Sequence, residues 1–183
     1  TAVTTRLPPV LCIVGRKNSV KTELTVVLGA ELTRRGYRVM TAKHGHGFHL
    51  DRPGKDSWRH RHEGGAHRTV LAGPSDFGVV GHWPSGEMPL SHLVERFLWD
   101  ADVVLAEGFK GDPAPKIEVF RGDQRSEPLL AGGEEWTSRI VALVTDARGL
   151  EAGVPVFRLD DSDLARSLAD FIQERFLAGG ESP

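Results

Sequence analysis

Short apolar runs alternate with amphipathic stretches along the chain. Residues 10–14 form a continuous apolar run stopped by Gly15, the pattern of a strand buried on both faces of a parallel sheet. From Lys21 onward, apolar residues recur at helical spacing until residues 34–36 supply two arginines and a glycine stop. The alternating run 37–42 predicts a second strand. The amino-terminal part is therefore predicted to be a right-handed strand–helix–strand unit.

The rest of the chain continues this alternation. Residues 43–53 are polar and rich in Gly and His without a period, which indicates a loop at a strand end. Helices are predicted over 55–64, 89–99 and 161–177. Further strands are predicted at 68–72, 76–82, 102–107, 116–121 and 139–145. We expect an α/β fold with three layers, in which a mainly parallel sheet carries some added antiparallel strands.

Length and composition indicate a compact globular protein. The chain has 183 residues, of which 39% are hydrophobic and 26% charged. A chain of this size buries about 70% of its unfolded surface, so it needs no disulfide or structural metal. We expect one domain over 1–183, with flexible ends at 1–9 and 178–183. The single cysteine, Cys12, lies in an apolar run and is expected to be a buried hydrophobe rather than a catalytic thiol.

Charge and hydropathy bear on partners and location. The formal net charge is -2 and the pI about 6.4, so no global positive field draws the protein to nucleic acid or to an anionic membrane. Apolar stretches fall well short of the roughly 20 residues that a membrane helix needs. The amino end lacks the basic and apolar regions of a signal peptide. These features predict a cytoplasmic protein.

The segment from Gly15 to Thr22 carries the strongest chemical signal. It reads Gly-Arg16-Lys17-Asn18-Ser19-Val20-Lys21-Thr and matches the phosphate-loop pattern G-x-x-x-x-G-K-[ST] at every fixed position but one. Backbone N–H groups at a helix amino end attract phosphate. Lys21 would reach the terminal phosphates, and Thr22 would offer its hydroxyl to Mg²⁺. The alternative is an ordinary strand-to-helix turn that happens to contain Lys-Thr.

Two further residues bear on this interpretation. Val20 stands where the pattern has glycine, and a β-branched residue resists the positive φ that glycine accepts. Glu107 ends the apolar run 102–107, where phosphate-loop proteins often place a carboxylate near the magnesium. Asp102, at the opposite end of that run, is expected to be a solvated strand start.

Four blocks in order resemble the molybdopterin-guanine dinucleotide biosynthesis adapter proteins (MobB), a family of P-loop GTP-binding proteins. They span about 11–146 and are the phosphate loop, residues 43–46 (Lys-His-Gly-His), residues 51–66, which contain Pro-Gly-Lys-Asp-Ser, and residues 107–119, which contain Glu-Gly-Phe-Lys and Pro-Lys-Ile-Glu-Val. The resemblance implies a P-loop NTPase-like fold. It also implies a homodimeric GTP-binding adapter, at most a slow GTPase, that assists the guanylyltransferase joining GMP to the molybdenum cofactor.

Carried over residue by residue, the resemblance assigns a site. Phosphate and Mg²⁺ would be bound by loop residues Gly15 to Glu23, although Glu23 stands where the family often has a second threonine. Gly108 would lie beside the terminal phosphate. Asp56 would lie near the magnesium or position a water, so Asp56 and Glu107 are the catalytic candidates. The magnesium ligands would be Thr22, Asp56 and Glu107. Molybdopterin or the molybdenum cofactor is a further candidate ligand.

Several polar residues in or near these blocks admit two interpretations. His44, His46 and His49 have residue types suited to a metal site, but the family block favours a loop that faces nucleotide or pterin phosphate. Three lysines, Lys43, Lys55 and Lys110, are either anion contacts or solvated surface charges.

A separate pair lies at the end of the last predicted strand. Thr145 is its final residue and Asp146 follows, in a position where an aspartate can accept two hydrogen bonds from a guanine edge. A turn-forming aspartate would show the same pattern, so the preference for guanine comes from the resemblance.

Three functions remain open from the sequence. The first is a GTP-binding adapter for molybdenum cofactor maturation. The second is a small-molecule kinase or NTPase, which would need an arginine lid and a base that the sequence does not reveal. The third is a binding module in which Val20 has impaired nucleotide binding.

Overall fold

The computed structural model describes residues 6–17, 19–48, 50–122 and 127–178. Asn18, His49 and the outer parts of the predicted flexible ends, 1–5 and 179–183, lie outside the described residues. The chain divides into two compact units, a main unit of Thr1–His44 with Pro89–Pro183 and an inserted unit of Gly45–Met88. The expectation of a single domain stays a prediction, because a compact unit of contacts need not fold alone.

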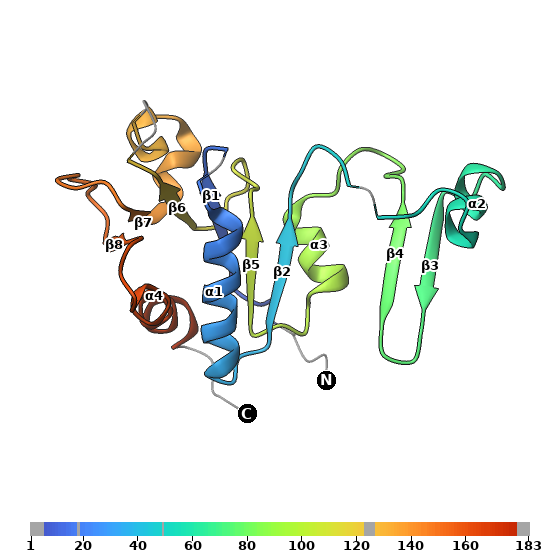
Figure 1. Cartoon of the computed structure of the whole chain (residues 1–183), viewed down its shortest axis with the longest axis horizontal. Coiled ribbons are helices and arrows are strands. Elements are labelled where there is room, and N and C mark those ends of the chain that lie inside the picture. The colour runs from blue at the N-terminus through green and yellow to red at the C-terminus, as the bar shows by residue number, and fades with distance from the viewer. Residues whose placement is uncertain (1–5, 18, 49, 123–126, 179–183) are drawn as a thin grey trace. The chain divides into compact units, whose positions relative to one another are not determined.

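A six-stranded sheet forms the centre of the main unit, and all its neighbouring strands pair in parallel. Its order is β2-β5-β1-β6-β7-β8. Figure 1 shows the strands with their carboxyl ends at one edge. The strands are β1 (Val10–Gly15), β2 (Val39–Lys43), β5 (Val103–Glu107), β6 (Lys116–Phe120), β7 (Ile140–Thr145) and β8 (Val156–Arg158).

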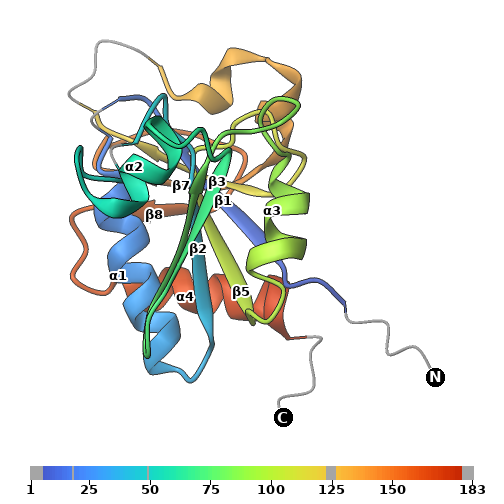
Figure 2. The ribbon, with the colours of Figure 1, turned by 90° about the vertical axis from the view of Figure 1, so that its right-hand side faces the viewer.

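Helices cover both faces of this sheet, which confirms the predicted three-layer α/β fold. Figure 2 shows α1 (Lys21–Arg34) and α3 (Leu90–Phe97) on opposite sides of the strands. The helix α4 (Leu164–Ile172) packs beside α1. On their side, the core is built from leucines of both helices and from inward strand residues such as Leu11 and Ile117. On the other side, α3 packs on Cys12, Val14, Val104 and Ala106.

The inserted unit holds a helix and a hairpin. Its elements are α2 (Asp56–His62) and the antiparallel strands β3 (Arg68–Ala72) and β4 (Phe77–Gly81). The antiparallel strands that the sequence predicts are therefore present, as a separate sheet. A buried ion pair joins Arg61 to Asp51 at 3.1 Å. Burial alone would raise the pKa of Asp51, but hydrogen bonds from Ser57 and Arg61 outweigh it, so the pKa is lowered.

The structure corrects the predicted elements at the carboxyl end. The final helix begins at Leu164, three residues later than predicted, and changes to a π-helical turn, η3 (Gln173–Leu177). The side chain of Asp163, which directly precedes the helix, makes no capping hydrogen bond. The sequence pattern missed β8 and two 3₁₀ turns, η1 (Leu129–Gly132) and η2 (Glu135–Arg139).

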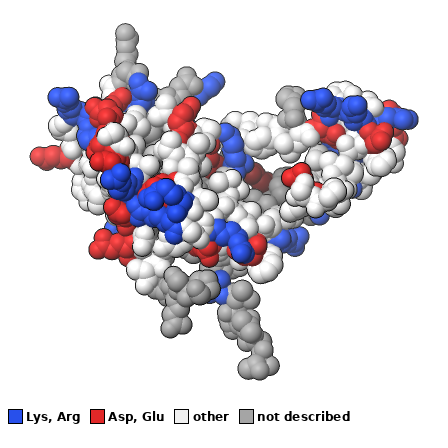
Figure 3. Space-filling view, turned by 60° about the horizontal axis from the view of Figure 1, so that its bottom comes forward, with Lys and Arg blue, Asp and Glu red and all other residues white. Residues whose placement is uncertain are grey.

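The surface carries both charges side by side. On the face in Figure 3, Lys and Arg lie next to Asp and Glu over much of the surface. Arg35 is one example, since it bridges Glu31 at 2.8 Å and Asp170 at 2.7 Å and so ties α1 to α4. Within the described residues, no helix has the length and apolar character needed to cross a membrane.

Candidate phosphate-binding site

The candidate phosphate loop lies at the carboxyl end of β1, in the middle of the parallel sheet. Strand β1 is buried because it pairs with β5 on one side and β6 on the other. The strands β5 and β2 lie on one side of β1 and β6, β7 and β8 on the other, so the strand order reverses here, at the kind of topological switch point where such folds bind ligands. Gly15 is required here, because an added Cβ would come within 2.5 Å of the Val119 carbonyl oxygen.

Val20 adopts the conformation that the pattern normally gives to glycine. Its φ is 55° and its ψ is 30°, which places it in the left-handed region immediately before α1. A side chain in this region costs about 1–2 kcal/mol. The half-buried Val20 side chain packs against the core beneath α1, so packing offsets part of that strain. The loop therefore keeps the backbone turn of the pattern without its second glycine.

Lys21 folds back over the loop that precedes it. Its Nζ donates to the carbonyl oxygen of Arg16 at 2.7 Å and lies 3.4 Å from that of Gly15. The Oγ of the buried Ser19 is 3.3 Å away. Burial lowers the pKa of Lys21, with Glu107 opposing this change and the positive charges of Lys110 and Lys43 adding to it. The ammonium is thus held at the centre of the loop.

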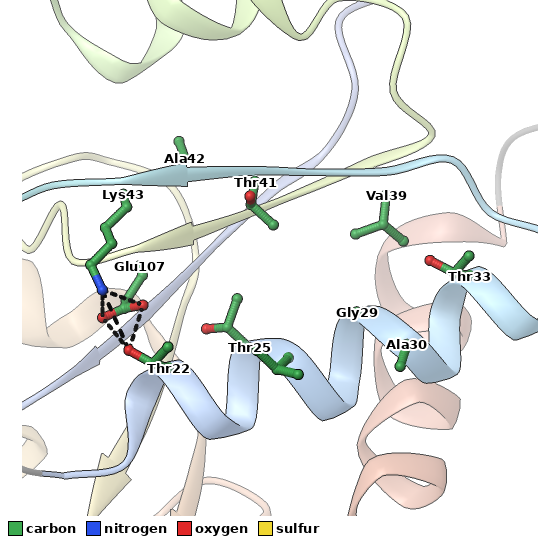
Figure 4. A pocket seen from close by; sticks show the side chains of 11 residues that line it. Thr22, Thr25, Gly29, Ala30, Thr33, Val39, Thr41, Ala42, Lys43 and Glu107 are labelled. Carbon is green, nitrogen blue, oxygen red and sulfur yellow. Dashed lines mark hydrogen bonds and ion pairs between the residues drawn. The ribbon is translucent and has the colours of Figure 1, made fainter. Parts of the chain in front are cut away.

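Thr22 and Glu107 meet although 85 residues separate them. The Thr22 hydroxyl donates to the Glu107 carboxylate, 3.0 Å from each oxygen. Lys43, at the end of β2, places its Nζ 3.1 Å from the same carboxylate (Figure 4). The three side chains come from α1, β5 and β2, whose adjoining ends share one edge of the sheet. A hydroxyl and a carboxylate in this position are oxygen ligands of the kind Mg²⁺ takes.

The chain leaves this cluster through two consecutive left-handed residues. Gly108 has φ 94° and Phe109 has φ 55°. The Gly108 N–H donates to the Ile13 carbonyl at 2.9 Å, which fixes the turn against β1. His44 lies beside it, because its N–H donates to the Glu107 carbonyl and its ring is 5.4 Å from that of Phe109. Strained backbone of this kind tends to gather at functional sites.

An open groove of about 380 Å³ runs from the Thr22–Glu107 cluster along α1. The side of α1 that faces β2 contributes mostly small residues, and β2 supplies the opposite wall (Figure 4). The lining residues are Thr22, Thr25, Val26, Gly29, Ala30, Thr33, Val39, Thr41, Ala42, Lys43 and Glu107.

Other predicted site residues of the main unit lie around the loop. Arg16 donates to the Glu127 carbonyl at 3.2 Å, and the Lys110 Nζ lies 6.0 Å from the centre of the Trp136 ring. Lys17 and Glu23 are exposed. Arg16 is part of the loop itself, and the charge of Lys110 is close enough to lower the pKa of Lys21. The roles of both residues stay predictions.

The predicted guanine contact is already engaged. The Asp146 carboxylate accepts the Gly122 N–H at 2.6 Å and lies 2.9 Å from Arg121 Nε. The buried Thr145 accepts the Ala147 N–H at 3.0 Å. Because Arg121 would have to move before the carboxylate could bind a base edge, recognition of guanine by Asp146 stays a prediction.

Three predicted site residues belong to the inserted unit. Asp56 begins α2, Lys55 precedes it, and His46 lies in the preceding loop. Their roles beside a nucleotide stay predictions. Among the described residues, no three His, Cys, Asp or Glu side chains are grouped to hold a metal ion.

Sequence reasoning quoted Lys116 and Glu118 in a block that carries the resemblance but gave neither of them a role. Lys116 and Glu118 are 0% and 1% exposed on β6, and both contact backbone next to the phosphate loop. Their signal was a pair of opposite charges two positions apart inside an otherwise apolar strand, which puts both on one face.

Comparisons with known proteins agree on one family. A family model described as molybdopterin guanine dinucleotide synthesis protein B (MobB) matches residues 10–146. The molybdopterin-guanine dinucleotide biosynthesis adapter protein of Haemophilus influenzae is 37% identical over 123 residues, covering 66% of this chain and 67% of that protein. The protein of the same name from Escherichia coli is 31% identical over 171 residues, covering 91% and 92%.

A solved structure shares the fold over nearly the whole length. The crystal structure of a MobB protein homolog from Bacillus stearothermophilus superposes with a TM-score of 0.64 at 26% identity, covering 91% of this chain and 99% of that one. The match therefore extends to both units rather than to the phosphate loop alone.

Proposed function

The chain belongs to the molybdopterin guanine dinucleotide synthesis protein B family, and from this premise we propose that it is a GTP-binding adapter. Its role lies in molybdopterin guanine dinucleotide synthesis. In the proposal, nucleotide binding and partner binding matter more than turnover, and GTP hydrolysis is slow at most.

The observation that carries the proposal is the meeting of Thr22 with Glu107 at the phosphate loop, 3.0 Å from hydroxyl to carboxylate. A turn that merely happened to contain Lys-Thr would have no reason to bring a carboxylate from the neighbouring strand to this hydroxyl. Mg²⁺ would be held by Thr22 and Glu107, and it would neutralise charge on the nucleotide phosphates. The Lys43 ammonium already contacts the Glu107 carboxylate, which shows that this carboxylate attracts positive charge.

The cluster favours binding over catalysis. Both Glu107 oxygens accept a hydrogen bond from Thr22, and both lie within 3.3 Å of the Lys43 ammonium. Both oxygens are therefore already engaged by a hydroxyl and an ammonium of the chain itself. This supports a metal ligand rather than the general base that a kinase would need.

We propose the loop to be competent despite Val20. The left-handed turn at Val20 is the one a phosphate loop requires, so valine strains the loop rather than reshaping it. This argues against a module that has lost nucleotide binding, although it predicts weaker affinity than a loop with glycine.

The proposed partners are the molybdenum cofactor guanylyltransferase and a second copy of this chain, in the cytoplasm. The inserted hairpin supports such contacts. Val70 and Phe77 are 64% and 78% exposed, and Val79 on the same face is 37% exposed. An isolated two-stranded hairpin is marginally stable in water, so an apolar face of this kind favours being covered.

Titration calorimetry with GTP and ATP, each with and without Mg²⁺, tests the proposal. We expect GTP to bind more tightly than ATP, and Lys21→Ala to abolish the binding. Arg166→Ala is the matched control, because it removes a cation that is 66% exposed on α4 and should leave the affinity unchanged. Absence of binding at millimolar GTP would reject nucleotide binding, and fast multiple-turnover hydrolysis would reject the adapter role.

A further inference from the structure

Strand β6 buries two opposite charges on one face of the sheet. All five of its residues are buried, including Lys116 at 0% and Glu118 at 1% exposure. Alternation along the strand turns Ile117 and Val119 toward the core beneath α1, so both charges point to the opposite face. A buried charge is costly unless its hydrogen bonds are satisfied, and each of these two charges has backbone partners.

Lys116 holds the segment that follows Glu107. Its Nζ donates to the carbonyl oxygens of Asp112 at 2.5 Å and Ala114 at 2.9 Å. Burial lowers its pKa, while the nearby Cys12 and Asp112 oppose that change. The ammonium thus ties residues 108–115 to the sheet.

Glu118 holds a second segment in the same way. Its carboxylate accepts the N–H of Leu129 at 2.5 Å and of Leu130 at 2.9 Å, the first two residues of η1. Burial raises the pKa of Glu118, and these two hydrogen bonds oppose the rise. The carboxylate therefore supplies the partners that the start of a helical turn lacks within itself.

Contacts connect both segments to the phosphate loop and, through η2, to each other. The charge of Lys110 in the first segment acts on Lys21 of the loop. Lys110 also lies over the ring of Trp136 in η2, at 6.0 Å, and η2 contacts η1 of the second segment. Arg16 of the phosphate loop donates to the carbonyl of Glu127, two residues before η1. Figure 1 shows the second segment, in orange, beside the carboxyl ends of β1 and β6.

We propose that Lys116 and Glu118 are positioning residues, which hold the 108–115 and 127–132 segments in place beside the phosphate loop before a ligand binds. Apolar side chains of similar volume would often be as stable in such a place. They would, however, leave two carbonyls and two N–H groups without partners and release both segments. The nucleotide part of this inference rests on the proposed function.

The first test compares GTP affinity in folded variants. Lys116→Met keeps the volume but removes the donors, and Glu118→Gln removes one acceptor oxygen. Ile117→Val is the control, because this neighbour on the same strand is equally buried but faces the other side. All titrations are run at a temperature where circular dichroism shows each variant folded.

We expect Lys116→Met and Glu118→Gln to weaken GTP binding about tenfold or more, since binding would then have to order the segments. Ile117→Val should lose stability but keep its affinity within about twofold of the original chain. Unchanged affinity in either charged-residue variant would overturn the proposal, as would an equal loss of affinity in Ile117→Val.

The second test needs no nucleotide. Acrylamide should quench the Trp136 emission more strongly in Lys116→Met than in the unchanged chain, with Trp136→Phe in each background isolating that signal. If the unchanged chain fails to bind GTP, the proposed function fails, and this quenching alone decides whether Lys116 positions the segment. Equal quenching overturns the proposal.

The third measurement uses the unchanged chain and remains available if the variants do not fold. Hydrogen exchange without nucleotide should show the amides of Leu129 and Leu130 protected, because both donate to the buried Glu118 carboxylate. Exchange of these two amides at the rate of an unstructured peptide would overturn the proposal.

Discussion

At position 20, a glycine variant should be more stable than an alanine variant, whereas alanine is the more stabilising of the two inside a helix. Val20 sits at φ 55° and ψ 30°. Val20→Ala removes most of the side-chain packing but keeps the strained Cβ, whereas Val20→Gly removes both. The difference between the two variants therefore isolates the backbone strain from the packing.

The magnitude follows from two opposing terms. Relief of a left-handed Cβ is worth about 1–2 kcal/mol. The greater freedom of glycine in the unfolded chain costs about 0.4–1 kcal/mol. The glycine variant should thus be more stable than the alanine variant by about 0–1.6 kcal/mol, and in a domain of this size each kcal/mol moves the melting temperature by about 2–4 °C.

Val26 supplies the matched control, because it lies inside α1 and is 63% exposed. There, glycine should be less stable than alanine by about 1 kcal/mol. Urea denaturation of the four variants measures both differences. If glycine is destabilising relative to alanine by about 1 kcal/mol at both positions, the strain at Val20 is refuted. Val20→Gly should also tighten GTP binding, and unchanged or weaker affinity would reject the steric account of this position.

Three further predictions concern a thiol, a pH range and a glycine. Burial raises the pKa of Cys12 to about 12, so a disulfide reagent at pH 8 should label it only after unfolding, and rapid labelling of the folded protein would contradict its burial. Hydrogen bonds from Arg34 and Arg35 lower the pKa of Glu31 to about 2. The contribution of these bonds to stability is therefore complete above pH 4.5 and is lost as the pH falls toward 2. Glu31→Gln should flatten this loss in acid denaturation followed by circular dichroism, and an unchanged profile would disprove the pairing. Gly15→Ala should destabilise the protein by about 1–3 kcal/mol in urea denaturation because its Cβ meets backbone, whereas Gly111→Ala, with open space around it, should be nearly neutral.

Much of the fold could be predicted from periodicity. The run 10–14 became β1, the helical spacing after Lys21 became α1, and 68–72 matches β3. Strand β8 was missed because its three residues, Val156–Arg158, follow a stretch rich in Gly and Pro and are too few to show a period. The turns η1 and η2 likewise lack a repeating apolar face.

The candidate site was predictable where it depends on strand ends. Parallel strands place their carboxyl ends at one edge, so a loop after β1 and a carboxylate ending β5 were predictable on the same edge, and the pairing of β1 with β5 brings Thr22 and Glu107 together there. Side-chain partners were not predictable in this way. Two examples are the ion pair of Asp146 with Arg121 and the backbone carbonyls that Lys116 contacts. Both depend on the conformation of loops, which no local sequence pattern determines.

The most direct test of the central claim is the magnesium dependence of GTP binding in the unchanged chain and in Glu107→Gln. The amide keeps the size of the carboxylate but loses its charge, so its affinity for Mg²⁺ falls. We predict that Mg²⁺ tightens GTP binding severalfold in the unchanged chain and has little effect in Glu107→Gln. An equal effect of Mg²⁺ in both proteins would contradict the assignment of Thr22 and Glu107 as the magnesium side of a nucleotide site.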